Sequence, residues 1–183
     1  MTRLRGPIDE LDHIQGPANA ELTLLEYGDY QCPYCAQAYP IVKRVQRRMG
    51  KRLRFVFRNF PLTAAHPLAL AAAETAEAAG AQGKFWEMHD RLYQRQAQLG
   101  MRLFLELAGE LMLDRARFVD DIEQGAYRQR VRDDFVGGVR SGVNGTPCFF
   151  IGDERHDGAW DEDALIDALE NAPQRGAATI MHP

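Results

Sequence analysis

The stretch Cys32-Pro33-Tyr34-Cys35 places two thiols three positions apart. The apolar run before it predicts a buried strand over residues 22–28, and the apolar spacing after it predicts a helix over residues 33–49. The two cysteines therefore lie where a strand leads into the first turn of a helix. There, unpaired backbone N–H groups and the positive end of the helix dipole favour a thiolate over a thiol. The sequence thus predicts a reactive dithiol.

Further strand and helix patterns flank this unit. Alternating apolar residues predict a second strand from Lys51 to Phe60. We expect it to run parallel to the first strand, with a right-handed crossover. A short strand is expected near His13, and Asp161 is expected to begin a last helix that reaches about Asn171.

The pattern is almost entirely helical from His66 to about Gly142, and strand signals return at residues 148–151 with a short partner around Arg155. The sequence therefore predicts an α/β fold with a central mixed β-sheet, interrupted by an all-α insertion of about five helices. The expected boundaries are 1–62 and 143–183 for the sheet domain, with 1–11 and 174–183 as loose ends, and 63–142 for the insertion.

Composition narrows the function classes. The 183 residues carry a net charge of −4, which argues against a nucleic-acid-binding protein. A local basic cluster between Arg44 and Arg54 is read as a solvated helix face. No apolar stretch has the length of a membrane span, and the first residues lack the apolar core of a secretory signal. We therefore expect no membrane partner and a cytoplasmic location, or a periplasmic one only if a signal was removed.

A dithiol in a reducing compartment is catalytic or metal-binding more often than structural. Zinc needs four ligands, but the chain has no second cysteine pair and its only other cysteine is Cys148. We therefore expect no metal and no cofactor other than the redox-active pair of Cys32 and Cys35.

Three other features sharpen the redox interpretation. Glu26 stands in the apolar strand six positions before Cys32, where burial would raise its pKa and suit it to proton exchange. The alternative is a solvated Glu that faces an edge. Pro40 lies inside the expected helix, where it removes a backbone hydrogen bond. Thr146-Pro147 directly precedes the returning strand, and a proline at such a turn invites a cis peptide.

Together with the dithiol, these residues resemble the DsbA-like family of thioredoxin-fold thiol–disulfide oxidoreductases, in which a helical domain is inserted in the thioredoxin fold. The likeness spans roughly residues 12–171. Other strings that carry it are Asn59-Phe60-Pro61, His66-Pro67, the segment 83–90 and the segment 142–147.

The resemblance implies a role for each matching residue. Cys32 would be the nucleophile that forms a mixed disulfide with the substrate, and Cys35 the buried thiol that resolves it. Glu26 would lie beneath Cys35 and help to move its proton.

The remaining matches concern tuning and substrate binding. Pro33 and Tyr34 would tune the redox potential. Pro147 would be a cis-proline that faces the dithiol, and Thr146 would offer backbone groups to an extended peptide. Cys148 is either an inert core thiol or one that reaches Cys32.

The expected function is thiol–disulfide exchange that forms, reduces or isomerises disulfides. Its partners would be protein or peptide thiols and disulfides, with glutathione as a candidate electron partner. Two alternatives stay open: a glutathione-linked transferase or isomerase on the same fold, and a non-catalytic peptide-binding (holdase-like) module. His66 and His89 are expected at the edge of the core in helical segments.

Overall fold

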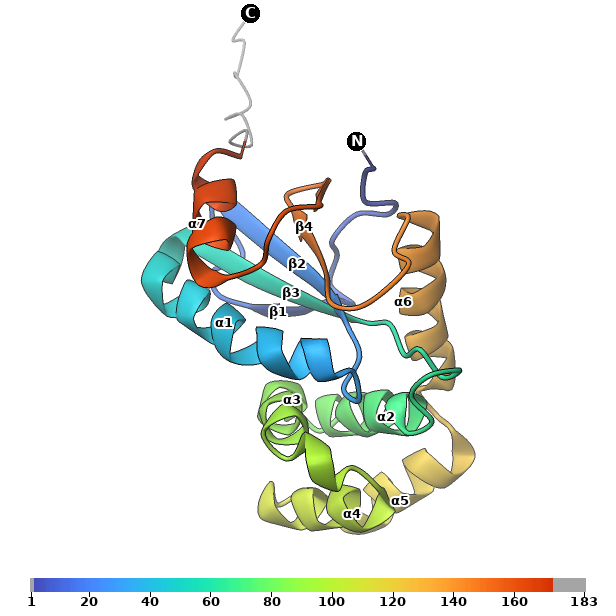
Figure 1. The fold of residues 1–183 in the computed structure, drawn as a ribbon. Coiled ribbons are helices and arrows are strands. Elements are labelled where there is room, and N and C mark those ends of the chain that lie inside the picture. The colour runs from blue at the N-terminus through green and yellow to red at the C-terminus, as the bar shows by residue number, and fades with distance from the viewer. Residues whose placement is uncertain (1, 173–183) are drawn as a thin grey trace, which may run out of the picture.

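The computed structural model describes residues 2–172, so the predicted loose end at 174–183 lies outside the described residues. Its centre is a five-stranded sheet with the strand order β1-β3-β2-β4-β5 (Figure 1). β2 and β3 are parallel, and each other neighbouring pair is antiparallel. The strands are β1 His13–Gln15, β2 Leu22–Gly28, β3 Leu53–Asn59, β4 Cys148–Ile151 and β5 Glu154–His156.

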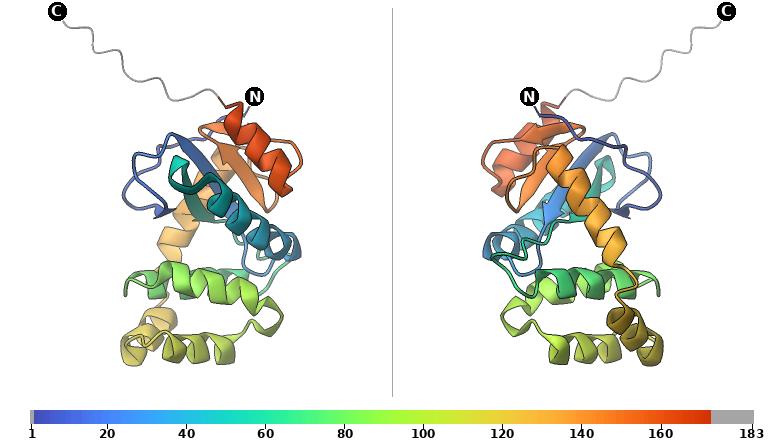
Figure 2. Two further views of the ribbon diagram at one scale, coloured as in Figure 1. Left: turned by 90° about the vertical axis from the view of Figure 1, so that its left-hand side faces the viewer. Right: turned by 90° about the vertical axis from the view of Figure 1, so that its right-hand side faces the viewer.

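Helices cover both faces of the sheet, and more helices lie beyond the carboxyl ends of β2 and β3 (Figures 1 and 2). α1 (Pro33–Met49) and α7 (Glu162–Glu170) lie on one face, and α6 (Arg128–Arg140) lies on the other. The segment between β3 and β4 holds five helices, as the sequence predicts. The four that precede α6 are α2 Ala69–Gly80, α3 Phe85–Gln94, α4 Met101–Glu110 and α5 Arg115–Gln124.

The position of β2 at the centre of the sheet explains why its sequence is nearly continuous in apolar residues. All seven of its residues are buried, because strands flank it on both sides and helices cover both faces. Alternate side chains enter two separate clusters: Leu24 packs on the α1 face, and Leu25 packs on the α6 face. The α1-face cluster extends without a break into the insertion.

Local sequence signals set several boundaries. Asp114 caps α5 and Asp161 caps α7, each through a side chain that accepts a backbone N–H. The second predicted strand begins at Leu53 rather than Lys51, because residues Gly50–Arg52 form a 3₁₀ turn (η1). Gly50 begins this turn with a φ of +54°, which glycine adopts without strain.

The basic cluster on α1 has a structural role. Arg44 pairs with Glu162 at 2.6 Å, and Arg48 pairs with Asp163 at 2.8 Å. These ion pairs join α1 to the first turn of α7 at the surface, where the Arg44 and Arg48 side chains stay 43% and 56% exposed.

α6 packs against both the sheet and the insertion. It contacts β3 of the sheet and α2 of the insertion, and its Phe135 stacks on Phe60. Val139, one turn further along, is exposed. The predicted domain boundary at residue 142 therefore falls after a helix that packs on the sheet itself, and the boundaries stay a prediction.

Among residues 2–172, no helix combines the length and apolar character needed to cross a membrane.

Candidate active site

Cys32 is the N-cap residue of α1, with the extended backbone conformation that such a position requires (φ −70°, ψ 123°). Pro33 fills the first helical position, where a missing N–H costs nothing. Gly28 ends β2 four residues earlier, so the loop between strand and helix is short. Only 3% of Cys32 is exposed, while 60% of Tyr34 faces solvent beside it.

The surroundings of Cys32 favour its thiolate. A hydrogen bond from the Cys35 side chain is the largest influence, and the backbone N–H groups of Tyr34 and Cys35 add to it. Together they lower the pKa of Cys32 to about 5, against the opposing effect of burial. This sulfur is therefore ionised at neutral pH.

Cys35 has the opposite character. It is fully buried, and burial raises its pKa well above the usual range of a thiol. The backbone N–H of Asp29 reaches its sulfur at 3.5 Å. Both sulfurs are free thiols in this structure. One ionised thiol and one neutral, shielded thiol thus lie side by side at the start of a helix.

Glu26 lies within the central strand, between Phe57 on β3 and Phe149 on β4. Only 2% of it is exposed, so the alternative of a solvated edge residue is wrong. Burial, followed by the negative charge of Cys32, raises its pKa to about 8. Its Oε1 atom has no hydrogen-bond partner among the described residues.

The loop before β4 lies against Cys32. The Thr146–Pro147 peptide is cis. The Cys32 Sγ lies 3.3 Å from the Thr146 carbonyl oxygen, to which the thiol form donates a hydrogen bond. Beside this contact lies an open hollow of about 290 Å³, whose lining includes Pro147 and Trp160.

Asp29 is a site residue that the sequence analysis missed. Its buried carboxylate accepts the Gln31 N–H at 2.8 Å and the Leu62 N–H at 2.9 Å, and it pairs with His66 Nδ1 at 2.7 Å. His66 lies in the turn before α2, so its placement in a helical segment was wrong. The available signal was an acidic residue directly after a strand and three positions before the dithiol.

The insertion also forms direct hydrogen bonds with the active-site loop. Gln96, in the 3₁₀ turn Gln96–Gln98 (η2), donates its side-chain amide to the carbonyls of Tyr30 and Cys32, at 2.8 Å each. Gln31 accepts the Leu68 N–H at 2.6 Å. No sequence pattern pointed to Gln96, because its partners lie more than sixty residues away.

His89 and Cys148 both prove to be core residues. His89 is 2% exposed, lies among aromatic rings and bonds the Tyr30 hydroxyl through Nδ1 at 3.0 Å. Cys148 is buried in the α6-face cluster, whereas Cys32 and Cys35 belong to the α1-face cluster. Burial raises the pKa of Cys148. The structure therefore favours the inert core thiol over one that reaches Cys32.

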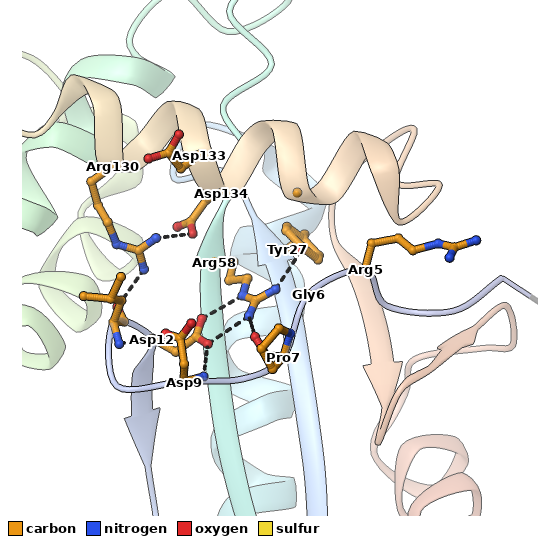
Figure 3. A pocket seen from close by; sticks show the side chains of 12 residues that line it. Arg5, Gly6, Pro7, Asp9, Asp12, Tyr27, Arg58, Arg130, Asp133 and Asp134 are labelled. Atoms are coloured by element: carbon orange, nitrogen blue, oxygen red, sulfur yellow. Dashed lines mark hydrogen bonds and ion pairs between the residues drawn. The ribbon is translucent and has the colours of Figure 1, made fainter.

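A second hollow, of about 220 Å³, lies between the N-terminal arm, β3 and α6 (Figure 3). Arg58 extends into it and binds both carboxylate oxygens of Asp12, at 2.7 and 2.8 Å. The same guanidinium donates to the Tyr27 hydroxyl and the Pro7 carbonyl. These partners tie the arm to the sheet.

Within residues 2–172, no three His, Cys, Asp or Glu side chains gather in a way that could hold a metal ion.

A protein-family model described as thioredoxin matches residues 9–171. The chain belongs to this thioredoxin family. Solved structures of the same fold include a thioredoxin-like oxidoreductase from Silicibacter pomeroyi, with 27% identity and a TM-score of 0.76 over 88% of this chain and 92% of that one.

Two other solved structures show that this thioredoxin-family chain has the DsbA-like fold with a helical insertion. BdbD from Bacillus subtilis is 19% identical, with a TM-score of 0.81 over 92% of this chain and 96% of that one. The thiol-disulfide exchange protein α-DsbA2 from Wolbachia pipientis is 22% identical, with a TM-score of 0.77 over 88% and 87%. The fold class predicted from the sequence is confirmed.

Curated relatives of this thioredoxin-family chain are much longer proteins. It is 43% identical over 167 residues to the Na(+)/H(+) antiporter NhaA 1 of Salinispora arenicola, and 40% identical over 181 residues to the antiporter NhaA of Herminiimonas arsenicoxydans. These matches cover 91% and 98% of this chain, but 26% and 28% of the relatives. The chain thus corresponds to about a quarter of each relative's length.

Proposed function

We propose that this protein is a thiol–disulfide oxidoreductase that works through a mixed disulfide on Cys32. The observation that carries the proposal is the contrasting placement of two neighbouring thiols: Cys32 caps α1 beside the Thr146 carbonyl, whereas Cys35 is fully buried. The pKa of Cys32 is lowered to about 5, while that of Cys35 is raised well above its usual value. An exchange enzyme needs this division, because one sulfur must attack as a thiolate while the other waits.

The reaction proceeds in two exchanges. The Cys32 thiolate attacks one sulfur of a substrate disulfide, and the other sulfur leaves as a thiolate that takes up a proton. Cys35 then loses its proton and attacks Cys32 Sγ, which releases the second substrate thiol and leaves a Cys32–Cys35 disulfide. The substrate gains two electrons and the protein loses two, and the reverse sequence forms a disulfide.

Glu26 is the proposed acceptor of the Cys35 proton. Its pKa of about 8 allows it to gain and lose a proton near neutral pH. Pro33 and Tyr34 are proposed to tune the potential, since they occupy the turn whose N–H groups face the Cys32 sulfur.

The proposed substrates are protein or peptide thiols and disulfides. The backbone of Thr146 beside Cys32, the exposed Tyr34 ring and the hollow next to Pro147 support an extended peptide at this position. Glutathione as the electron partner and a cytoplasmic location stay predictions from the sequence.

The test is the reduction of insulin disulfides with dithiothreitol as the electron donor. Cys32→Ser should abolish catalysis. Cys148→Ser is the matched control, and it should retain wild-type turnover because this thiol lies on the other face of the sheet. Wild-type turnover by Cys32→Ser would overturn the proposal.

Cys35→Ser separates the alternatives. Under dithiol exchange, this variant should accumulate a covalent adduct between Cys32 and a peptide thiol, visible by non-reducing electrophoresis and mass spectrometry. A glutathione-linked enzyme would instead keep full turnover with glutathione in Cys35→Ser. A peptide-binding module would bind unfolded peptide with no turnover even in the wild type.

A further inference from the structure

Two buried polar atoms on the α1 face of the sheet lack hydrogen-bond partners among the described residues: Glu26 Oε1 and the hydroxyl of Tyr93. Tyr93 comes from α3 of the insertion and is 5% exposed, whereas Glu26 comes from the central strand. A buried hydroxyl without a partner destabilises the folded protein, so its retention calls for an explanation.

Aromatic packing fixes the Tyr93 ring. It stacks on Tyr39 of α1 with ring centroids 5.3 Å apart, and it lies 5.0 Å from the Tyr30 ring and 5.1 Å from the His89 ring. None of these contacts uses the hydroxyl. The ring is therefore held by its faces and edges, and the hydroxyl is free to bond elsewhere.

The hydroxyl is aimed at the strand that carries Glu26. A Cβ atom added at Gly28 would lie 3.0 Å from the Tyr93 oxygen, so the hydroxyl occupies the space that a side chain at Gly28 would fill. Gly28 and Glu26 are two residues apart on β2 and therefore share one face. Cys35 reaches the same region from α1, since it lies in the α1-face cluster and its sulfur accepts the N–H of Asp29, the residue next to Gly28.

The charges around Tyr93 keep its hydroxyl protonated. Burial, followed by the negative charges of Cys35 and Glu26, raises the pKa of Tyr93 well above its usual value. A neutral hydroxyl can donate one proton while it accepts another. The titratable and charged groups that face it from β2, α1, α3 and the active-site loop are Glu26, Cys35, Tyr39, His89, Asp29 and Tyr30.

We propose that the Tyr93 hydroxyl relays the proton between Cys35 and Glu26 during resolution of the mixed disulfide. The inference rests on the proposed function and adds a proton-relay residue from the insertion.

The relay conserves every proton. The Cys35 S–H gives its proton to the Tyr93 oxygen while the Tyr93 O–H passes its own proton to Glu26 Oε1. The products are a Cys35 thiolate, an unchanged tyrosine and a neutral Glu26. The thiolate then attacks Cys32 Sγ, and the substrate leaves as a thiolate. Because Glu26 must be ionised to accept, resolution accelerates as the pH rises towards about 8.

The test follows the reaction of the reduced protein with dithiobis(nitrobenzoate), whose coloured thiol is released twice. The first release reports attack by Cys32, and the second reports resolution by Cys35. Tyr93→Phe keeps the ring and removes only the hydroxyl. Its matched control is Tyr39→Phe, because the Tyr39 ring stacks on Tyr93 while its hydroxyl pairs with Gln94 at the surface.

The expected result is a second release slowed about tenfold or more in Tyr93→Phe, with the pH inflection near 8 lost. The first release and the control should match the wild type. Glu26→Gln should lose the same inflection, and adding it to Tyr93→Phe should slow resolution little further, since both act on one path.

A second release that keeps its wild-type rate and inflection in Tyr93→Phe overturns the relay. So does a change confined to the free energy of unfolding, which would indicate a packing role. A missing first release in the wild type would instead contradict the proposed function, so the two failures are distinguishable.

Discussion

At the scale of single residues, Glu26 and Cys32 oppose one another in their effect on stability. The pKa of Glu26 is raised from 4.5 to about 8 in the folded protein, so its contribution to stability is complete below pH 4.5 and is lost as the pH rises through 8. The pKa of Cys32 is lowered from 9.0 to about 5, so its contribution is complete above pH 9 and is lost as the pH falls through 5. In the wild type, the two contributions change stability in opposite directions as the pH rises, so they partly cancel.

Substitution of either residue should therefore reveal how the other one changes the free energy of unfolding with pH. Glu26→Gln should gain stability relative to the wild type as the pH rises from 4.5, by roughly 3 kcal/mol at pH 7, because each pKa unit corresponds to about 1.4 kcal/mol. Cys32→Ser should lose stability relative to the wild type over the range from pH 5 to 9. Urea unfolding of the three proteins at several pH values measures both differences.

Other titrating groups, such as the buried Asp134, are common to all three chains, so they do not enter the differences. Parallel stability profiles for Glu26→Gln and the wild type would contradict a raised pKa for Glu26.

At the scale of elements, the insertion holds the active-site loop through Gln96. Its amide donates to the carbonyls of Tyr30 and Cys32, and the Cys32 carbonyl also accepts the first helical N–H of α1, from Ala36. One side chain of the insertion thus fixes the residue that carries the nucleophile.

Gln96→Ala should therefore affect both stability and reactivity. We expect the free energy of unfolding to fall by about 1–2 kcal/mol, for two hydrogen bonds, and the pKa of Cys32 to rise, because the amide dipole no longer faces its carbonyl. Urea unfolding and the pH dependence of alkylation measure these effects. Gln98→Ala is the control, since Gln98 lies in the same turn and its side chain bonds only Arg95 among residues 2–172. Equal behaviour of the two variants would show that Gln96 has no special role.

At the scale of the whole molecule, the Arg58–Asp12 pair joins the N-terminal arm to β3 (Figure 3). Both side chains are almost fully buried, at 9% and 3% exposure. A buried charge whose partner is removed destabilises a protein strongly.

Arg58→Met should therefore lower the free energy of unfolding by about 3–5 kcal/mol, because it leaves the Asp12 carboxylate buried and unpaired. The double variant with Asp12→Asn should recover part of the loss, as thermal and urea unfolding can establish. Additive losses in the double variant would contradict a coupled pair.

The parts of the molecule that could be predicted from the sequence are those set by local patterns. Neighbours within a few residues determine the apolar run of β2 and the thiols at the start of α1. They also determine the helix caps Asp114 and Asp161. Burial of Glu26 also followed from its apolar strand.

The rest depends on contacts between distant segments. Gln96 meets the active-site loop across more than sixty residues, and Asp29 meets His66 across thirty-seven. Tyr93 reads in the sequence as one more aromatic residue of a helical stripe. Only the packing of α3 against α1 and β2 brings its hydroxyl beside Gly28, at the end of the strand that leads to the dithiol.

The most direct test of the account is the pH dependence of Cys32 alkylation in the reduced protein, measured with iodoacetamide in the Cys148→Ser background. We predict a rate that rises to half its maximum near pH 5. A midpoint near that of free cysteine, about 8.5, would contradict the ionised nucleophile on which the exchange reaction depends.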